Sequence, residues 1–478
     1  MKTVFVSGSF NVLHPGHLRL IKFAKSHGDK LVVGVFSDKI AGKAAHVSEK
    51  LRLDSLKNNK LVDEVVLIKD SLIKTIFKVK PNIIVKGKEH EQKFNEEEEI
   101  VKKIRGKLIF SSGDTIFSSI DLIRKEVEIV DRGILDKTKD YLKRNKLNIN
   151  EIIHSIKSFK NLRVCVIGDL ILDKYIYCDP IGMSQEDHSI VASPIDEEIF
   201  LGGASIVAAH AAGMGAKTHY FGVAGKDKSS KLASNLLKRY GVKSEIIEDS
   251  TRLTTIKNRY ISDNNTLFRL TEINQENISK KLEAKILNKF KKIVKKIDIL
   301  IFSDFNYGIL TNNLIQQLIK IAKAKNLIIS ADCQSSSQIG DISKYKDLDL
   351  ITPTEREARI STKNFKDGLI VMTEALRKLS GANNILLKLG SDGIIIHSAT
   401  NKSKIDNDRL PSLNAKPISV SGAGDSMLVG ASLSLALKND KKIWLAALIG
   451  SLFSAIQVSR LGNIPVKAKE LIESIKKV

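Results

Sequence analysis

Cysteine is scarce in this 478-residue chain, which contains only Cys165, Cys178 and Cys333. The three lie far apart in the sequence, they show no metal-binding spacing, and their number is odd. These facts argue against a disulfide scaffold and against a zinc-ribbon type of site. We therefore expect buried, reduced thiols and a cytoplasmic protein.

Proline and long apolar runs are also rare. The 8 prolines and 29 glycines form no low-complexity tract, and no internal repeat is visible. No run of about 18 apolar residues occurs, so no membrane-spanning helix is expected. The first residues have a strand pattern and not that of a signal peptide. At this length we expect two domains or slightly more, each with its own core.

Acidic residues are outnumbered, since 77 Lys and Arg against 54 Asp and Glu give a formal charge of +23. A nucleic-acid-binding protein is therefore the alternative from another functional class. The excess lysines, however, are spread along the chain, as at residues 280–281 and 291–292, and tryptophan occurs once, at Trp444. No aromatic-rich basic stripe is present, so no nucleic acid and no membrane partner is expected. The acidic run at residues 96–99 indicates an exposed helix face and not a metal site.

A short motif near the start carries the first chemical signal. Residues 5–17 read Phe-Val-Ser-Gly-Ser-Phe-Asn-Val-Leu-His-Pro-Gly-His. An apolar strand pattern breaks there, and a helical pattern resumes at His17, so that His14 and His17 flank Gly16 at a strand-to-helix junction. Helix N-terminal amides, a close-approaching glycine and imidazole donors all suit phosphate. The motif therefore predicts a phosphate-binding site.

Further strand patterns follow at residues 29–37, 65–68 and 82–87 and alternate with helical patterns. This alternation predicts a doubly wound α/β domain with a parallel sheet and a ligand at the carboxyl ends of its strands. Ser118 and Ser119 stand where hydroxyl groups cap a helix and bind phosphate.

With its His-x-Gly-His motif, this first part resembles the cytidylyltransferase-like family. The resemblance implies transfer of a nucleotidyl group from a nucleoside triphosphate, ATP or CTP, to a sugar or polyol phosphate, with release of pyrophosphate. It implies that His14 and His17 contact the triphosphate in the transition state, and that Lys43 or Lys39 neutralises the phosphates. The other nucleotide- or phosphate-binding residues that it implies are Ser9, Phe10, Gly16, Arg52, Ser118 and Ser119.

A second α/β pattern starts after residues 131–160, which are charged, poor in glycine and typical of a helical connector. We expect domains over residues 1–130 and 161–478. In the second of these, Gly422-Ala423-Gly424-Asp425 precedes an apolar helix. Small residues expose successive backbone N–H groups to a phosphoryl group, and the Asp425 carboxylate can accept the proton of an attacking hydroxyl. The segment therefore predicts phosphoryl transfer.

Together with a Gly-Gly near the start of this domain, the segment around Asp304 and the Thr-Glu-Arg-Glu run ending at Glu357, it resembles the ribokinase-like (PfkB) sugar kinases. The resemblance implies a ribokinase-like domain with a small β lid, and it is consistent with a homodimer through that domain. It implies ATP as phosphoryl donor, Asp425 as base, and Mg²⁺ held by Glu357 through water. The other implied residues are Asp169, Gly202, Gly203 and Asp304 for the sugar and Gly390, Gly422, Ala423 and Gly424 for the nucleotide.

Several segments, among them residues 168–175 and 303–308, look like the heptose 7-phosphate kinase branch, and the first domain resembles its usual heptose 1-phosphate adenylyltransferase partner. The domain order is the reverse of the usual one. The resemblance implies phosphorylation of D-glycero-D-manno-heptose 7-phosphate at its anomeric hydroxyl. Nucleotidyl transfer to the 1-phosphate would then give ADP-heptose for lipopolysaccharide or another surface glycan.

Departures from the branch fall where the sugar should bind. Its Asn is Ile206, its Lys is Tyr307, its proline-rich segment is residues 185–190, and its Asp-Pro-Lys is Asp-Cys-Gln at residues 332–334. Sites built to bind hydroxyl groups discriminate through them, so the substrate pocket is expected to differ. The alternatives are a different sugar or polyol phosphate with a CDP-linked product, one active domain only, or two domains that serve different substrates.

Overall fold

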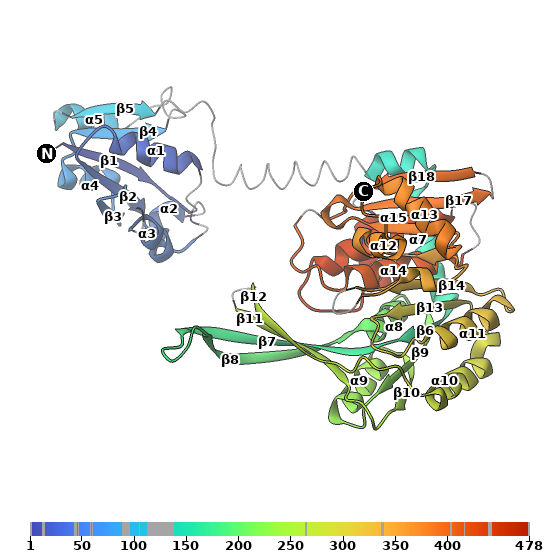
Figure 1. Cartoon of the computed structure of the whole chain (residues 1–478). Helices are drawn as coiled ribbons and strands as arrows, with labels where there is room; N and C mark the ends of the chain where they lie inside the picture. The colour runs from blue at the N-terminus through green and yellow to red at the C-terminus, as the bar shows by residue number, and fades with distance from the viewer. Residues whose placement is uncertain are drawn as a thin grey trace. The chain divides into compact units, whose positions relative to one another are not determined.

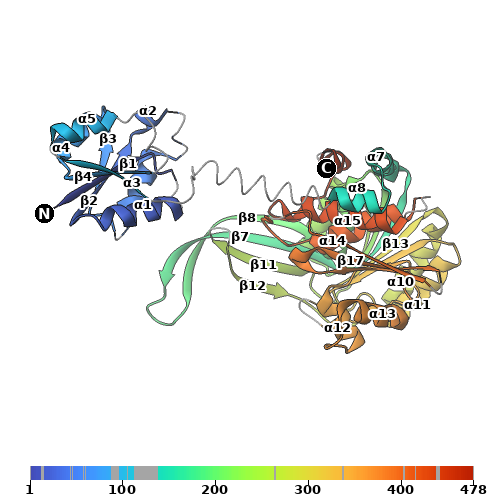
Figure 2. The ribbon, with the colours of Figure 1, turned by 90° about the horizontal axis from the view of Figure 1, so that it is seen from above.

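The chain forms two compact units, residues 1–130 and 131–478 (Figures 1 and 2). A computed structural model describes residues 2–11, 15–42, 45, 47–57, 59, 61–87, 96–104, 106–111, 138–262, 265–335, 339–401, 404–414, 416–437 and 442–476. Each unit is built on its own parallel or mostly parallel sheet.

The first unit is a five-stranded sheet in the order β3-β2-β1-β4-β5, and every pair in it is parallel. Alternate residues of β1 enter separate cores: Val4 and Val6 pack on one face, Phe5 on the other. Burial on both faces explains why the strands are continuous apolar runs. The doubly wound fold expected from the sequence is therefore confirmed. The elements are β1 (Thr3–Gly8), α1 (Pro15–Lys25), β2 (Lys30–Phe36), α2 (Asp38–Ala41), α3 (Glu49–Lys57), β3 (Glu64–Ile68), α4 (Leu72–Val79), β4 (Ile83–Gly87), α5 (Glu96–Lys103) and β5 (Lys107–Ser111).

The second unit has a nine-stranded sheet in the order β10-β9-β6-β13-β14-β15-β16-β17-β18. Its first seven strands are parallel, and β17 and β18 join antiparallel. The carboxyl ends of the parallel strands therefore meet at one edge, where a ligand is expected. The strands are β6 (Arg163–Gly168), β9 (Lys217–Ala224), β10 (Lys243–Glu248), β13 (Ile299–Asp304), β14 (Ile328–Cys333), β15 (Leu350–Ile351), β16 (Asn384–Lys388), β17 (Ile394–Asn401) and β18 (Lys404–Leu410).

Helices cover both faces of this sheet (Figure 2). One face packs on α7 (Ile149–Ser158), α8 (Gly203–Gly213), α9 (Lys228–Arg239), α14 (Ala423–Leu435), α15 (Lys442–Val458) and α16 (Ala468–Ile475). The other packs on α10 (Lys280–Ile293), α11 (Asn312–Lys323), α12 (Glu355–Thr362) and α13 (Leu369–Ser380). Short 3₁₀ turns lie at Phe159–Asn161, Val294–Lys296, Ile342–Lys344 and Gly390–Asp392.

A separate four-stranded sheet, which we call the lid, has the order β12-β11-β7-β8. Its strands are β7 (Leu170–Met183), β8 (Ile190–Gly202), β11 (Thr255–Ser262) and β12 (Asn265–Glu272). The long β7–β8 hairpin extends away from the nine-stranded sheet (Figure 1). The small β lid implied by the resemblance to sugar kinases is present.

The segment before β6 belongs to the packing of the second unit. Tyr141, Ile152 and Ile156 are fully or almost fully buried in its core, and the Tyr141 hydroxyl donates to the carbonyl oxygen of Trp444 at 2.8 Å. Within the described ranges, the helices are all too short or too polar to cross a membrane.

Candidate active site

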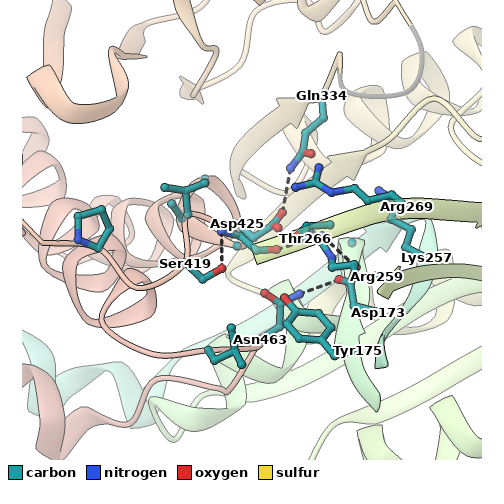
Figure 3. A pocket seen from close by; sticks show the side chains of 18 of the residues that line it. Asp173, Tyr175, Lys257, Arg259, Thr266, Arg269, Gln334, Ser419, Asp425 and Asn463 are labelled. Carbon is teal, nitrogen blue, oxygen red and sulfur yellow. Dashed lines mark hydrogen bonds and ion pairs between the residues drawn. The ribbon is translucent and has the colours of Figure 1, made fainter. Parts of the chain in front are cut away.

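A cavity of about 850 Å³ lies between the lid and the carboxyl edge of the nine-stranded sheet (Figure 3). Lid strands β7, β11 and β12, the end of β16 and the loop leading into α14 all supply lining residues. This is the edge at which an open α/β sheet binds its ligand.

Asp425 lies in the first turn of α14 and lines this cavity. Burial, and then the neighbouring charge of Asp332, raise the pKa of the Asp425 carboxyl from its ordinary value to about 7. The Gln334 amide donates to Asp425 Oδ1 at 3.4 Å. A carboxyl group with a pKa near neutrality is suited to accept a proton from a hydroxyl group.

The turn before Asp425 requires small residues. Gly422 has φ +76°, and a Cβ atom there would lie 2.6 Å from Asn463 Oδ1. A Cβ on Gly424 would lie 3.0 Å from Lys388 Nζ. Gly422, Ala423 and Gly424 all line the cavity, at the N-terminus of a helix of 13 residues. The turn can therefore present backbone N–H groups to an anion.

A second cavity of about 490 Å³ adjoins the first and shares Lys388, Gly390 and Gly424 with it. Its other walls are mostly apolar, among them Ile394, Leu413, Met427, Ala455 and Val458. The first cavity, which we call the polar cavity because many charged side chains line it, thus meets a more apolar cavity at the turn before Asp425. Gly390, expected from the sequence to bind nucleotide, lies at this junction.

Glu357 lines the first cavity, and two backbone N–H groups donate hydrogen bonds to its carboxylate. Its Oε2 accepts the N–H of Thr354 at 2.7 Å in a capping box, and its Oε1 accepts the N–H of Ser335 at 3.0 Å. Each oxygen keeps a lone pair for a further hydrogen bond. Across the described residues, no three His, Cys, Asp or Glu side chains are grouped so as to hold a metal ion.

Of the carboxylates near the end of β6, the structure brings Asp173 and not Asp169 to the cavity. Asp173 Oδ2 accepts from the Asn463 amide at 2.8 Å, and Oδ1 accepts from Arg259 at 3.2 Å (Figure 3). A Cβ on Gly202 would lie 2.5 Å from Asp173 Oδ2, which explains the glycine. Gly203, with φ +55°, lines the cavity.

Asp169 and Asp304, both expected to bind sugar, are almost fully buried and absent from the lining of the cavity. Asp169 Oδ2 accepts the N–H of Phe305 at 2.7 Å, and Asp304 pairs with Lys344 at 2.6 Å. Burial, together with the Asp304 charge, raises the pKa of Asp169 to about 7. Asp169 and Asp304 therefore stabilise the turn that contains Phe305, and Phe305 does line the cavity.

Three cationic side chains of the lid line the cavity, Lys257, Arg259 and Arg269 (Figure 3). Lys257 Nζ lies 4.6 Å from the centre of the Phe305 ring, and the Arg259 guanidinium lies 5.5 Å from the centre of the Tyr175 ring. No motif identified Lys257 or Arg259 in the sequence. Their signal was the spacing at alternate positions of one strand, which places Lys257 and Arg259 on the same face.

The departures noted in the sequence fall mostly away from this cavity. Ile206 belongs to α8 and is fully buried in the core, and residues 185–190 form the exposed end of the lid hairpin. Tyr307 is buried with its ring 5.4 Å from Lys257 Nζ. Only Gln334, in the Asp-Cys-Gln segment, lines the cavity.

The first unit brings Phe10 and His17 together after β1, with ring centres 5.0 Å apart. Phe10 is buried with φ +49°, and Gly16 lies in the first turn of α1. Arg52 is buried and donates to the carbonyl oxygens of Ser9, Phe36 and Val47 and to the Asp38 carboxylate. It therefore holds the ends of β1 and β2. His14, Lys43, Ser118 and Ser119 lie outside the described residues.

Comparison with known proteins bears on both units. The family described as pfkB family carbohydrate kinase matches residues 161–469, and the family described as Cytidylyltransferase-like matches residues 5–167.

Among curated relatives, "Bifunctional protein HldE" of Desulfatibacillum aliphaticivorans is 31% identical over 327 residues, 67% of this chain and 65% of that protein. The protein of the same name from Campylobacter jejuni (strain RM1221) is 30% identical over 320 residues, 65% of this chain and 64% of that protein. The match thus spans about two thirds of the length of these relatives.

Among solved structures, the ribokinases of Thermotoga maritima and Giardia lamblia resemble the chain with TM-scores of 0.51 and 0.53. Their identities are 20% and 19%. Each alignment covers 66% of this chain and 100% or 99% of the ribokinase. At such identities the likeness concerns the fold.

Proposed function

The chain belongs to the pfkB family of carbohydrate kinases, and from that premise we propose that its second unit phosphorylates a sugar phosphate with ATP. The observation that carries the proposal is the position of Asp425, which lies where a polar cavity meets an apolar one beside the turn of small residues. The apolar cavity suits a nucleoside, and the polar cavity suits a sugar.

In this reaction the acceptor hydroxyl oxygen attacks the γ-phosphorus of ATP as its proton passes to Asp425. The bond from the γ-phosphorus to the bridging oxygen breaks, and its electron pair stays on ADP. The amides of residues 422–424 stabilise charge on the transferred phosphoryl group. The pKa of about 7 lets Asp425 accept the proton near neutral pH.

Hydroxyl recognition falls to Asp173, in place of the carboxylates expected from the sequence. Asp173 is held by Asn463 and Arg259 and is 4% exposed at the cavity wall. A fixed, buried carboxylate discriminates among hydroxyl patterns because an unmatched partner leaves it unsatisfied.

The lid cations support an anionic acceptor. Lys257, Arg259 and Arg269 come from neighbouring antiparallel strands and line one cavity. Such a cluster suits a phosphate group on the sugar. D-glycero-D-manno-heptose 7-phosphate is the acceptor we propose, with phosphorylation at its anomeric hydroxyl.

Mg²⁺ fits the site as a hydrated ion bound to the phosphates of ATP. Glu357 would hold it through water, since both of its oxygens already accept backbone N–H groups. Mg²⁺ commonly keeps several waters and is bound by substrate phosphates with one or two carboxylates. When bound, the ion would neutralise phosphate charge.

We further propose that the first unit transfers a nucleotidyl group to the 1-phosphate, giving ADP-heptose and pyrophosphate. The match of residues 5–167 to the cytidylyltransferase-like family and the position of His17 at the start of α1 support this step. His14, Lys43, Ser118 and Ser119 would join His17 and Gly16 at the triphosphate. We also propose a cytoplasmic enzyme that forms a homodimer through the lid.

The test is a coupled assay of the full chain with D-glycero-D-manno-heptose 7-phosphate, Mg²⁺ and either ATP or CTP, with products identified by mass. ADP-heptose would support both steps. A bisphosphate alone with ATP would keep the kinase, and a CDP-linked product would replace ATP by CTP in the first unit. Absence of any sugar product would contradict this acceptor and lead to other sugar or polyol phosphates.

A further inference from the structure

Lys388 occupies the boundary between the two cavities of the second unit. It is the last residue of β16 and lines both the polar cavity with Asp425 and the apolar cavity next to it. A group that passes from a nucleotide in one cavity to an acceptor in the other crosses this boundary.

The ammonium group of Lys388 is held among carboxylates. Its Nζ donates to Asp332 Oδ1 at 2.9 Å and to Oδ2 at 3.1 Å, and Asp332 is 1% exposed. The charges of Asp332, Glu357 and Asp425 raise the pKa of Lys388 against the opposite effect of burial. The group is therefore a fixed positive charge at neutral pH.

The same ammonium group faces the turn of small residues. A Cβ atom on Gly424 would lie only 3.0 Å from Lys388 Nζ, so the lysine and the start of α14 border one space. An ammonium group has three hydrogens, and two are directed to Asp332. The third can be donated to a ligand in that space.

We propose that Lys388 is a catalytic residue that contacts the phosphoryl group during its transfer. This inference rests on the proposed kinase activity. As the acceptor oxygen bonds to the γ-phosphorus and the bridging oxygen leaves with its electron pair, the acceptor proton goes to Asp425. Lys388 keeps its own proton and stabilises charge on the transferred oxygens. A purely structural lysine would serve only to neutralise Asp332.

Two variants separate these roles. Lys388→Met leaves the buried Asp332 carboxylate with the Thr352 hydroxyl but without its cationic partner, which alone could weaken the fold. The double variant Lys388→Met with Asp332→Asn removes both charges and is expected to stay folded, as checked by Trp444 fluorescence. Asp332→Asn alone keeps the ammonium group. Lys323→Met, which removes a surface ion pair with Asp347 in the same unit, is the control.

The first readout is formation of ADP with the sugar phosphate as acceptor. The double variant is expected to lose about 10²-fold in kcat, as when one preorganised donor is removed. Asp332→Asn should lose far less. Wild-type kcat in the double variant would overturn the proposal, and so would equal losses in the double variant and in Asp332→Asn.

The second readout needs no acceptor. Hydrogen exchange of residues 421–435 is followed as ATP or AMP is added with Mg²⁺, which localises binding to the second unit. The double variant should bind ATP about tenfold more weakly and AMP unchanged, since the contact is to the added phosphates. An unchanged ratio of ATP to AMP affinity would overturn the proposal. Failure of the wild type to phosphorylate any sugar phosphate would instead count against the proposed function.

Discussion

Replacing Asp425 by asparagine is expected to lower the kcat of sugar phosphorylation by about 10²–10⁴-fold and at the same time to stabilise the second unit. Asparagine keeps the shape of the side chain and carries no charge to desolvate. The buried carboxyl has its pKa raised from 3.8 to about 7. A difference of that size corresponds to at most about 4 kcal/mol in the free energy of unfolding at alkaline pH.

The sign follows from proton binding. The folded protein holds the Asp425 proton more tightly than the unfolded chain does, so this contribution to stability is complete below about pH 4. It is lost as the pH rises through about 7. The advantage of Asp425→Asn over wild type should therefore grow between pH 5 and pH 8.

Urea unfolding followed by tryptophan fluorescence measures this advantage. Trp444 is the only tryptophan and lies in α15, so the signal reports on the second unit alone. Asp347→Asn, which changes an exposed carboxylate of the same unit, should show no such pH dependence. A stability difference that does not change with pH would refute the reasoning from burial.

The activity of the same variant tests the proton transfer. Loss of a general base costs about 10²–10⁴-fold in kcat. Wild-type kcat should fall tenfold for each pH unit below about 7, because the carboxylate must be ionised to accept a proton. Nucleotidyl transfer by the first unit should be unchanged. Retained phosphorylation in Asp425→Asn would show that another group takes the proton.

Three further results are expected. Asp173→Asn should raise the KM for the sugar phosphate about tenfold and leave the KM for ATP unchanged, because it replaces one of two buried acceptor oxygens by an NH2 donor; steady-state kinetics with each substrate varied would measure this. Lys257→Met combined with Arg269→Met should weaken binding of the phosphorylated sugar about tenfold, but not of its unphosphorylated form, and should reduce the dependence on salt, as calorimetry would show. His17→Ala should lower nucleotidyl transfer by about 10²-fold with sugar phosphorylation unaffected, measured by separate release of pyrophosphate and ADP.

Much of the fold could be predicted from local patterns. The apolar run at residues 82–87, for example, contains β4. Because both faces of a parallel sheet are buried, such a strand is a continuous apolar run and can be recognised in a single sequence. The turn at residues 422–424 could also be predicted, because its small residues and the apolar helix that follows are adjacent in the sequence.

That Asp173, and not Asp169, lines the cavity could not be predicted in that way. The two residues lie four apart at the end of one strand and the start of the next, and both are carboxylates near a Gly-Gly. The difference arises from partners far along the chain. Asp169 accepts the backbone N–H of Phe305, whereas Asp173 accepts hydrogen bonds from Asn463 and Arg259 at the cavity. Lys388 was hidden for the same reason, since Asp332 is its partner only in three dimensions.

The attachment of the lid has a mechanical consequence. Only Asp169 separates the end of β6 from the start of β7, and β8 runs directly into α8 at Gly203. Neither end of the β7–β8 hairpin is therefore joined to the rest of the unit by a long loop. The hairpin therefore has little freedom to move as a rigid body. Any movement of its outer end must bend the strands or change the backbone torsion angles at Asp169 and Gly203. The Asp169 carboxylate also accepts the backbone N–H of Phe305, which lines the cavity. A displacement of the outer end of the hairpin is therefore coupled to the wall of the cavity.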